Sequence, residues 1–447
     1  MEKQSQGASD SFARVAIEEN QVNVRLVNNS RFRSLCVGSF ISMLGDQLTL
    51  VTLPWLALFL FNEPWVLGAV LGALAVPMTV FLLVSGAVVD RFSPKSVLLI
   101  SKAINAALMF LLVGLLMVDQ LNFWSLISIV LVLGTSSAFA IPAGSALLPE
   151  LVNSSQLPAA NGFGMMLRSI TNIIGPLLAA VLLGIELNSS EGEVSHQGLI
   201  WIFSIDGLTF VVSAIILAVI KVEPRRSSSR VNKLLSNVIA GFGYFKQNKE
   251  LLKITLYLAV VTSFLGGFMQ VGMPLMVQQH WQEGSQSYGY LLAFFAFGNV
   301  LGSMLVSKLR QIIKLSVGAS VLLTDLFVGI ALIGLSQSTS VLQGQCILFI
   351  MGVFAGYVQV IFMSWVQMST QRELLGRVMG IVTFALIGLL PLSAMLSGFI
   401  LQSIAIDLFF LIAGAALSIV ALSALLFSSI VKIGSVNKLS VASELTS

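Results

Sequence analysis

The sequence has little charge and few residues that bind metals or act as nucleophiles. Only 10% of its 447 residues are Asp, Glu, Lys or Arg, whereas soluble proteins contain about 25%. Its two cysteines are predicted on opposite sides of a membrane, Cys36 at the inner end of one apolar segment and Cys346 near the outer end of another, which argues against a disulfide. His196 and His280 lie in separate polar segments. The sequence has no GxxxxGK phosphate-binding loop, so ATP is not expected to drive the protein directly. We therefore predict no metal site and no set of catalytic residues.

What the chain has instead is hydrophobic residues. They make up 56% of it, and the mean hydropathy is +0.94. A helix needs about 20 apolar residues to cross a bilayer, and helices satisfy their own backbone hydrogen bonds in lipid. We therefore predict an all-α membrane protein with twelve transmembrane helices. The predicted spans are 34–60, 66–88, 97–117, 123–147, 165–186, 199–220, 254–277, 288–307, 315–336, 342–366, 378–400 and 407–430.

The positions of the charges predict the orientation of these helices. All 24 Lys and Arg residues fall in the tails, at the ends of spans or in loops on one predicted side, which is the cytoplasmic side by the positive-inside rule. The loops of the opposite side carry acids: Glu63, Asp119, Glu186, Glu191, Glu193, Glu283 and Asp407. The chain is therefore predicted to lie in the cell (inner) membrane with both termini in the cytoplasm and no cleavable signal peptide.

The spans divide into two sets of six. We predict a tail over 1–33, a bundle over 34–220, a linker over 221–253, a second bundle over 254–430 and a tail over 431–447. The linker pattern favours an amphipathic helix on the inner leaflet, and a docking site for a partner is the alternative. A short repeat, LPAANG from Leu157 and LGRVMG from Leu375, suggests that the two halves are related.

The predicted loop after the second span reads GAVVDRFSPK, from Gly86 to Lys95. Asp90 beside Arg91 and Lys95 could form a clasp between bundles that is made and broken as the protein changes state; a simple cytoplasmic anchor is the alternative. These residues resemble the G-x-x-x-D-R-x-x-x-[RK] signature of the major facilitator superfamily. That resemblance implies two six-helix bundles, alternating access and a clasp that stabilises the outward-open state. The matching stretch from Gly302 lacks the Asp.

The fifth span resembles the antiporter motif of drug/proton exporters. Gly162, Gly175 and Pro176 match the motif, whereas Thr171 and other small residues replace its remaining glycines. Small residues still permit close helix packing. The first and sixth spans look like those of the branch that includes macrolide and siderophore exporters. The resemblance implies a proton-coupled antiporter for a small amphipathic organic molecule, driven by the proton motive force without a cofactor.

Three acids fall well inside predicted spans and away from their ends, where an ionisable group is costly unless it is paired or hydrated. Asp46 lies near the middle of the first span, Asp206 is in the sixth and Asp325 is in the ninth. A carboxyl group at such a depth could bind and release a proton as access alternates, so all three are candidates for proton coupling. Structural hydrogen bonding is the alternative for each, and Asp46 is the first candidate because the superfamily's first helix lines the cavity.

Polar side chains at helical spacing are the candidates for lining a substrate cavity. Ser42 and Thr49 share a face with Asp46, and Met363 lies between two glutamines on the tenth span. The cavity candidates are Ser42, Thr49, Arg168, Gln270, Gln359 and Gln367. Arg168 could instead reach the inner interface, and the Met-containing stripe could be ordinary packing.

We thus expect a monomeric multidrug, macrolide or siderophore efflux pump that works with protons and membrane lipids and does not bind nucleic acid. The alternatives are an importer, facilitator or lysolipid flippase of the same fold, and a transport-inactive membrane scaffold.

Overall fold

In the computed structural model, the described residues are 26, 28–153, 156–185, 196–222, 243–245, 247–312, 315–371 and 374–434. The regular structure among them is entirely helical, and twelve helices are long and apolar enough to cross a membrane. The predicted fold class is therefore confirmed. Most of the predicted linker and most of each predicted tail lie outside the described residues.

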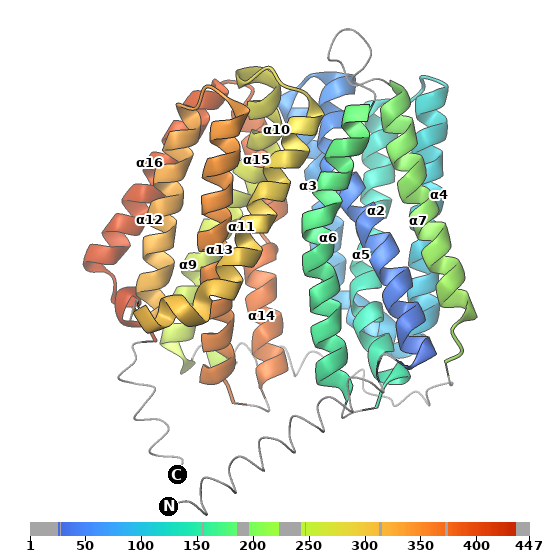
Figure 1. The fold of residues 1–447 in the computed structure, drawn as a ribbon, viewed down its shortest axis with the longest axis horizontal. Coiled ribbons are helices and arrows are strands. Elements are labelled where there is room, and N and C mark those ends of the chain that lie inside the picture. Colours follow the sequence, from blue (N-terminus) through green and yellow to red (C-terminus); the bar gives the residue numbers. More distant parts are fainter. Residues whose placement is uncertain are drawn as a thin grey trace, which may run out of the picture.

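The first six spanning helices form the N-bundle, on the right in Figure 1. They are α2 (Ser30–Phe61), α3 (Pro64–Arg91), α4 (Pro94–Met117), α5 (Phe123–Leu151), α6 (Leu157–Ile185) and α7 (His196–Val219). Several starts follow from local sequence: Asn29 and Asn122 cap α2 and α5 with their side chains, and Pro94 occupies the first turn of α4. The fifth helix begins at Leu157, earlier than the predicted 165, because the polar residues before the apolar run are also helical.

The C-bundle contains the other six spans. Its first span is α9 (Lys249–Gly267), which continues through η3 (Phe268–Gly272), α10 (Met273–Leu275) and η4 (Met276–His280). It is followed by α11 (Ser285–Ile312), α12 (Val317–Ser336), α13 (Val341–Ser369), α14 (Leu375–Ile387), α15 (Leu390–Ile400), α16 (Ile406–Phe427) and the short η5 (Ser429–Lys432). The π-helical η3 and η4 flank Pro274, a position where an ordinary helical hydrogen bond is lost.

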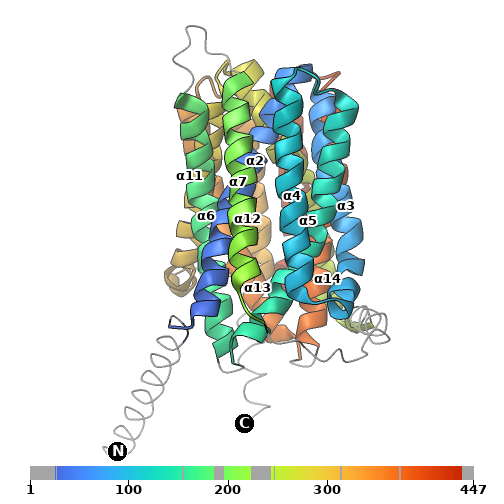
Figure 2. The same ribbon diagram turned by 90° about the vertical axis from the view of Figure 1, so that its right-hand side faces the viewer.

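Corresponding helices pack in corresponding ways in the two bundles. The α3–α5 contact of the N-bundle matches the α11–α13 contact of the C-bundle, and α4–α7 matches α12–α16. Figure 2 shows α4 and α7 side by side on the outside of the N-bundle. The α11–α13 contact is close because glycines face backbone: a Cβ on Gly302 would lie 1.9 Å from the Val353 carbonyl oxygen, and one on Gly356 would lie 1.9 Å from that of Asn299.

The two bundles join toward one end of the molecule. Gly68 of α3 faces Gly398 of α15, Gly289 of α11 packs against α6, and the rings of Trp55 and Tyr288 lie 6.5 Å apart. Toward the opposite end, where α2 begins and η5 lies, α14 packs against α9 and α13 of its own bundle. The arrangement is thus closed by cross-bundle packing at the end remote from the start of α2.

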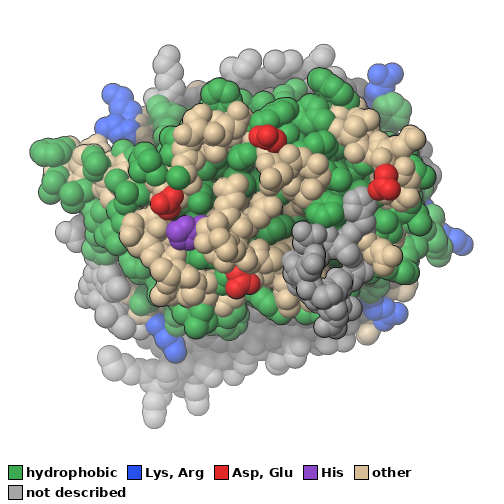
Figure 3. Space-filling model, turned by 90° about the horizontal axis from the view of Figure 1, so that it is seen from above, with side chains coloured by type: hydrophobic (Ala, Val, Ile, Leu, Met, Phe, Trp, Pro, Cys, Tyr) green, Lys and Arg blue, Asp and Glu red, His purple; other side chains and the backbone are tan. Residues whose placement is uncertain are grey.

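The closed end carries acidic side chains. Seen from above, this face shows Asp, Glu and His groups, whereas Lys and Arg groups appear only at the outline of the view (Figure 3). The described acids at this end are Glu63, Asp119, Glu283 and Asp407, which lie in or beside the connections between spans. This charge asymmetry agrees with the pattern on which the predicted orientation rests.

Candidate functional site

The N-bundle holds a cluster of charged side chains within its spans. Asp46 lies on α2, Lys102 on α4 and Asp206 on α7, and α7 packs against both of the other helices. Lys102 interacts electrostatically with both acids, and Asp46 also interacts with Arg168 of α6. The structure therefore brings together Asp46, Asp206 and Arg168, which the sequence singled out separately, and adds Lys102 to them.

Asp206 is the fully buried acid of this cluster, with a side chain that is 0% exposed; we call it the sealed acid. Its carboxylate accepts hydrogen bonds from the hydroxyls of Thr49, on α2, and Thr209, one turn along α7. Gly45 makes room for it, because a Cβ there would lie 2.2 Å from Asp206 Oδ1 and 2.1 Å from Thr209 Oγ1. The predicted cavity residue Thr49 is thus a partner of a buried acid, and a buried charged group requires such partners.

Lys102 lies beside the same acids but makes its hydrogen bond to a neutral group. Its Nζ donates to Ser42 Oγ at 2.5 Å and sits 5.5 Å from the centroid of the Phe210 ring. The sequence analysis counted Lys102 among the positive charges at the cytoplasmic ends of spans. In the structure it stands eight residues after Pro94, the first residue of α4. Pro94 marks the start of the helix, and this signal could have placed Lys102 two turns inside the span.

Asp46 is the accessible acid. It lies at the middle of α2, and its side chain is exposed. On the neighbouring α6, the exposed residues Asn161, Met165, Arg168 and Asn172 share one face, because they recur at helical spacing. The Asn172 side-chain carbonyl oxygen accepts a hydrogen bond from Gln47 Nε2 at 2.9 Å, which ties this face to α2. Because the carboxyl group of Asp46 is exposed, it can exchange protons with water.

The residues of the predicted clasp are partly described. The backbone of Gly86 and Asp90 belongs to α3, and the side chain of Asp90 lies outside the described part of the structure. Arg91 is exposed, and its guanidinium lies 5.8 Å from the Phe92 ring centroid. Lys95 Nζ donates to the carbonyl oxygens of Ala218 and Ile220 at 2.8 and 2.7 Å. Lys95 therefore stabilises the carboxyl end of α7 within its own bundle, where a cation is favoured.

The antiporter-like motif lies where α6 meets α2 and α11. A Cβ on Gly175 would lie 2.4 Å from the Gln47 Cβ, and one on Gly289 would lie 2.9 Å from the Pro176 carbonyl oxygen. Gly162 differs, since a Cβ there would meet nothing within 4 Å. Gly175 and Pro176 thus lie at close helix contacts, one of them between the bundles, whereas Gly162 does not.

The candidates of the C-bundle do not join the charge cluster. Asp325 is buried in α12 beside the Tyr257 hydroxyl of α9, and its Oδ2 has no hydrogen-bond partner within the described ranges. Gln359 and Gln367 are exposed on α13, and Gln270 is half-buried in η3. These neutral amides could hydrogen-bond an organic molecule without adding charge.

Comparison with known proteins identifies the family. Residues 35–390 match the profile of the Major Facilitator Superfamily. The chain belongs to this superfamily. Superfamily members are transporters and not enzymes, and the twelve spans make this chain a multi-pass membrane protein. No group of three or more His, Cys, Asp or Glu residues that could hold a metal occurs in the described part of the chain.

Two relatives within the superfamily are exporters at low identity. The chain is 25% identical to macrolide efflux protein A of Streptococcus pyogenes over 355 residues, which cover 77% of this chain and 83% of the relative. It is 24% identical to the enterobactin exporter EntS of Escherichia coli O1:K1 over 363 residues, which cover 80% of this chain and 82% of that exporter.

Solved structures with the same fold include the nucleoside transporter NupG, with a TM-score of 0.63, 13% identity, and coverage of 88% of this chain and 98% of that one. A bacterial homologue of the lysosomal transporter Spinster, in an inward-facing and unoccupied conformation, has a TM-score of 0.59 and 16% identity, and covers 90% of this chain and 94% of its own. These likenesses establish the major facilitator fold.

Proposed function

We propose that this transporter exports an amphipathic organic molecule in exchange for protons. The observation that carries the proposal is the accessible carboxyl group of Asp46 in the middle of a spanning helix, with Lys102 and Arg168 in electrostatic range. An ionisable side chain at this depth is costly unless it has a function or a partner. Proton binding to Asp46 would change the net charge of the cluster and thereby favour one conformation over another.

The substrate class is proposed from the exporters named above and from the side chains of the C-bundle. Gln359 and Gln367, with Met363 between them on α13, offer hydrogen bonds and an adaptable apolar contact without charge. This combination suits a large amphipathic molecule such as a macrolide or a siderophore. The C-bundle would therefore select the substrate, while the N-bundle would couple its movement to protons.

The closed end would face outward and the start of α2 would face the cytoplasm, in the inner membrane. The cross-bundle packing around Gly68, Gly289 and Trp55 would then form the outer gate, and the structure would represent an inward-open state. In the outward-open state, the loop with Gly86, Asp90, Arg91 and Lys95 would form the clasp between the bundles. Lys95 would have to leave the end of α7 to do so.

The test is accumulation of a panel of macrolides, cationic dyes and siderophores in efflux-deficient cells, with and without a protonophore. Wild-type protein should lower the accumulation of at least one compound class, and both the protonophore and Asp46→Asn should abolish that effect. Export that persists at full rate with either treatment would contradict proton coupling. Uptake in place of export would contradict the proposed direction and favour an importer.

A further inference from the structure

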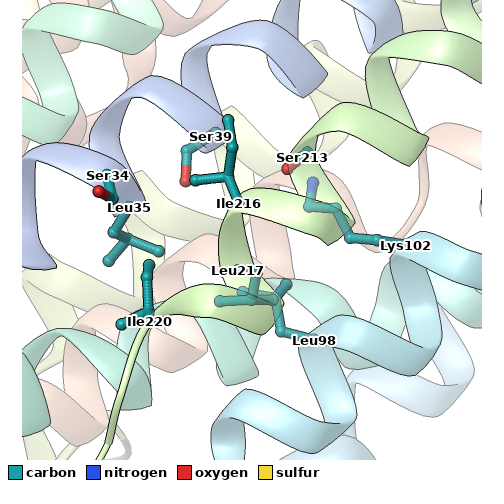
Figure 4. Close-up of a pocket in the computed structure, with 10 residues that line it drawn as sticks. Ser34, Leu35, Ser39, Leu98, Lys102, Ser213, Ile216, Leu217 and Ile220 are labelled. Carbon is teal, nitrogen blue, oxygen red and sulfur yellow. The ribbon is translucent and has the colours of Figure 1, made fainter.

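Lys102 is the charged group of the N-bundle whose place in the structure is least expected from the sequence. A narrow crevice between α2, α4 and α7 leads to its side chain (Figure 4). The hydroxyl groups of Ser34, Ser39 and Ser213 line the crevice together with apolar side chains. Its volume of about 10 Å³ has room for about one water molecule. Lys102 thus lies at a mostly apolar crevice between these helices, whereas Asp46 is exposed and interacts with Arg168 of α6.

The charge of Lys102 interacts with two acids rather than with one. Its hydrogen bond goes to Ser42, whose own hydroxyl donates to the Ser39 carbonyl oxygen at 3.1 Å. Asp206 has two hydroxyl donors of its own, and Asp46 lies one turn along α2 from Ser42. Lys102 interacts with both carboxylates through space. Because neither acid holds the ammonium group in a hydrogen bond, loss of charge on one acid shifts the balance of attraction on the ammonium group toward the other acid.

We propose that Lys102 is the internal counter-cation through which the accessible Asp46 and the sealed Asp206 act as one unit. With both acids ionised, the ammonium group is shared. When Asp46 takes up a proton, its attraction for Lys102 is lost, and the ammonium group is drawn toward Asp206. Since the three groups belong to α2, α4 and α7, this displacement links proton binding to the packing of the N-bundle. Lys102 is a positioning residue in this scheme, and Asp46 carries the proton.

The other charged groups near this unit are few. Among the described residues of the packed helices, Arg168 of α6 interacts with Asp46, and α5, which packs against α4, carries Glu150 near its end. Asp206 interacts through space with Asp46 as well as with Lys102. The expected pH dependence therefore depends mainly on Asp46, Asp206, Lys102 and Arg168.

The proposal rests on the proposed function, and its test uses a readout that requires no substrate. Met165, which is 72% exposed on the α6 face near Arg168, is replaced by Cys in a Cys36→Ser/Cys346→Ser background. The rate of thiol labelling in the purified full-length protein is then measured from pH 5 to pH 9 and divided at each pH by the rate in the unfolded protein, because thiol ionisation alone raises the rate with pH. The variants are Lys102→Met, Asp206→Asn, the double variant and Lys102→Arg. Asp325→Asn serves as a matched control, because it removes a buried acid from the other bundle.

The signs of the expected shifts follow from charge. Loss of the Lys102 cation makes ionisation of Asp46 harder, so Lys102→Met should move the midpoint of the pH profile upward, by about one unit. Asp206→Asn removes a neighbouring negative charge and should move the midpoint downward. The double variant removes one charge of each sign and should return close to wild type, while Lys102→Arg and Asp325→Asn should leave the midpoint in place.

Two results overturn the proposal in different ways. A wild-type profile with a clear midpoint that neither Lys102→Met nor Asp206→Asn moves, or that both move in the same direction, contradicts the shared role of Lys102 and leaves proton coupling intact. A flat wild-type profile, together with protonophore-insensitive accumulation in cells, contradicts proton coupling itself. If Lys102→Met does not fold, the double variant and Lys102→Arg decide: a midpoint displaced by a unit or more in both overturns the proposal.

Discussion

The two bundles of this transporter share one architecture but differ in what they bury. The N-bundle places Asp46, Lys102 and Asp206 within electrostatic range of one another, whereas the described C-bundle buries Asp325 beside a tyrosine and exposes neutral glutamines on α13. Lys102 and Asp325 each stand eight residues after the start of the third spanning helix of their bundle (Pro94 and Val317). Equivalent positions thus carry opposite charges. The difference indicates that one half is suited to handle protons and the other to contact a neutral or amphipathic molecule.

The largest effect on stability is expected where the halves are alike, at the contacts between glycines and backbone. Gly302→Ala and Gly356→Ala would each place a Cβ 1.9 Å from a carbonyl oxygen of the facing helix. Overpacking of this kind costs about 1–3 kcal/mol, and the upper part of that range is expected because backbone cannot move aside. Thermal unfolding in detergent should show lower Tm values for both. Gly134→Ala, which faces Leu74 in the equivalent N-bundle contact, should behave similarly.

The control for this experiment is Gly380→Ala, since a Cβ there would meet nothing within 4 Å. Its Tm should match or exceed that of the wild type, because alanine favours helix over glycine. Equal losses of stability for Gly380→Ala and Gly302→Ala would contradict the close α11–α13 contact.

A smaller loss, specific to the N-bundle, is expected at Gly45. Gly45→Ala would push the side chains of Asp206 and Thr209, which can shift more easily than backbone, so the expected cost is about 1–2 kcal/mol. Displacement of Asp206 should also move the midpoint of the pH-dependent labelling profile. The control is Gly114→Ala, which has open space around it in the same bundle. A Gly45→Ala protein with wild-type Tm and midpoint would contradict the packing of Asp206 against α2.

These positions also indicate which features of the fold and of the charge cluster could be predicted from the sequence. The spans were predictable, because about 20 apolar residues are needed to cross lipid and positive charge alternates from loop to loop. Asp46 and Asp206 were identifiable as costly charges within those spans. Their proximity was not, since side chains so far apart in the sequence meet only through helix packing. Lys102 was missed because a lysine near a predicted span end looks like a cytoplasmic anchor, although it reaches Ser42.

A change in the C-bundle should affect substrate and leave proton coupling alone. Gln359→Ala and Gln367→Ala each remove an exposed amide from α13, and the loss of a hydrogen bond to substrate should weaken transport of some compounds by up to about tenfold. The protonophore sensitivity of the remaining transport should not change. Concentration-dependent transport rates for several compounds measure this effect. An altered pH dependence in these variants would contradict the division of roles between the bundles.

The smallest effect is expected at Lys95. Lys95→Met removes a cation from the carboxyl end of α7, where its Nζ bonds two carbonyl oxygens, and such an interaction contributes about 0.3–1 kcal/mol. The Tm should fall slightly, and the fall should shrink at high salt because exposed charge interactions are screened. Lys249→Met, which alters an exposed lysine at the start of α9, is the comparison and should not lower the Tm.

The central claim is that proton coupling belongs to the N-bundle. It is tested most directly in proteoliposomes, by measuring transport of a compound identified in the cell assay with and without an imposed pH gradient. The variants are wild type, Asp46→Asn and Asp325→Asn. We predict that the gradient drives accumulation by wild type and Asp325→Asn, whereas Asp46→Asn exchanges labelled for unlabelled compound but does not respond to the gradient. Gradient-driven accumulation by Asp46→Asn, or its loss in a folded Asp325→Asn protein, would contradict the claim.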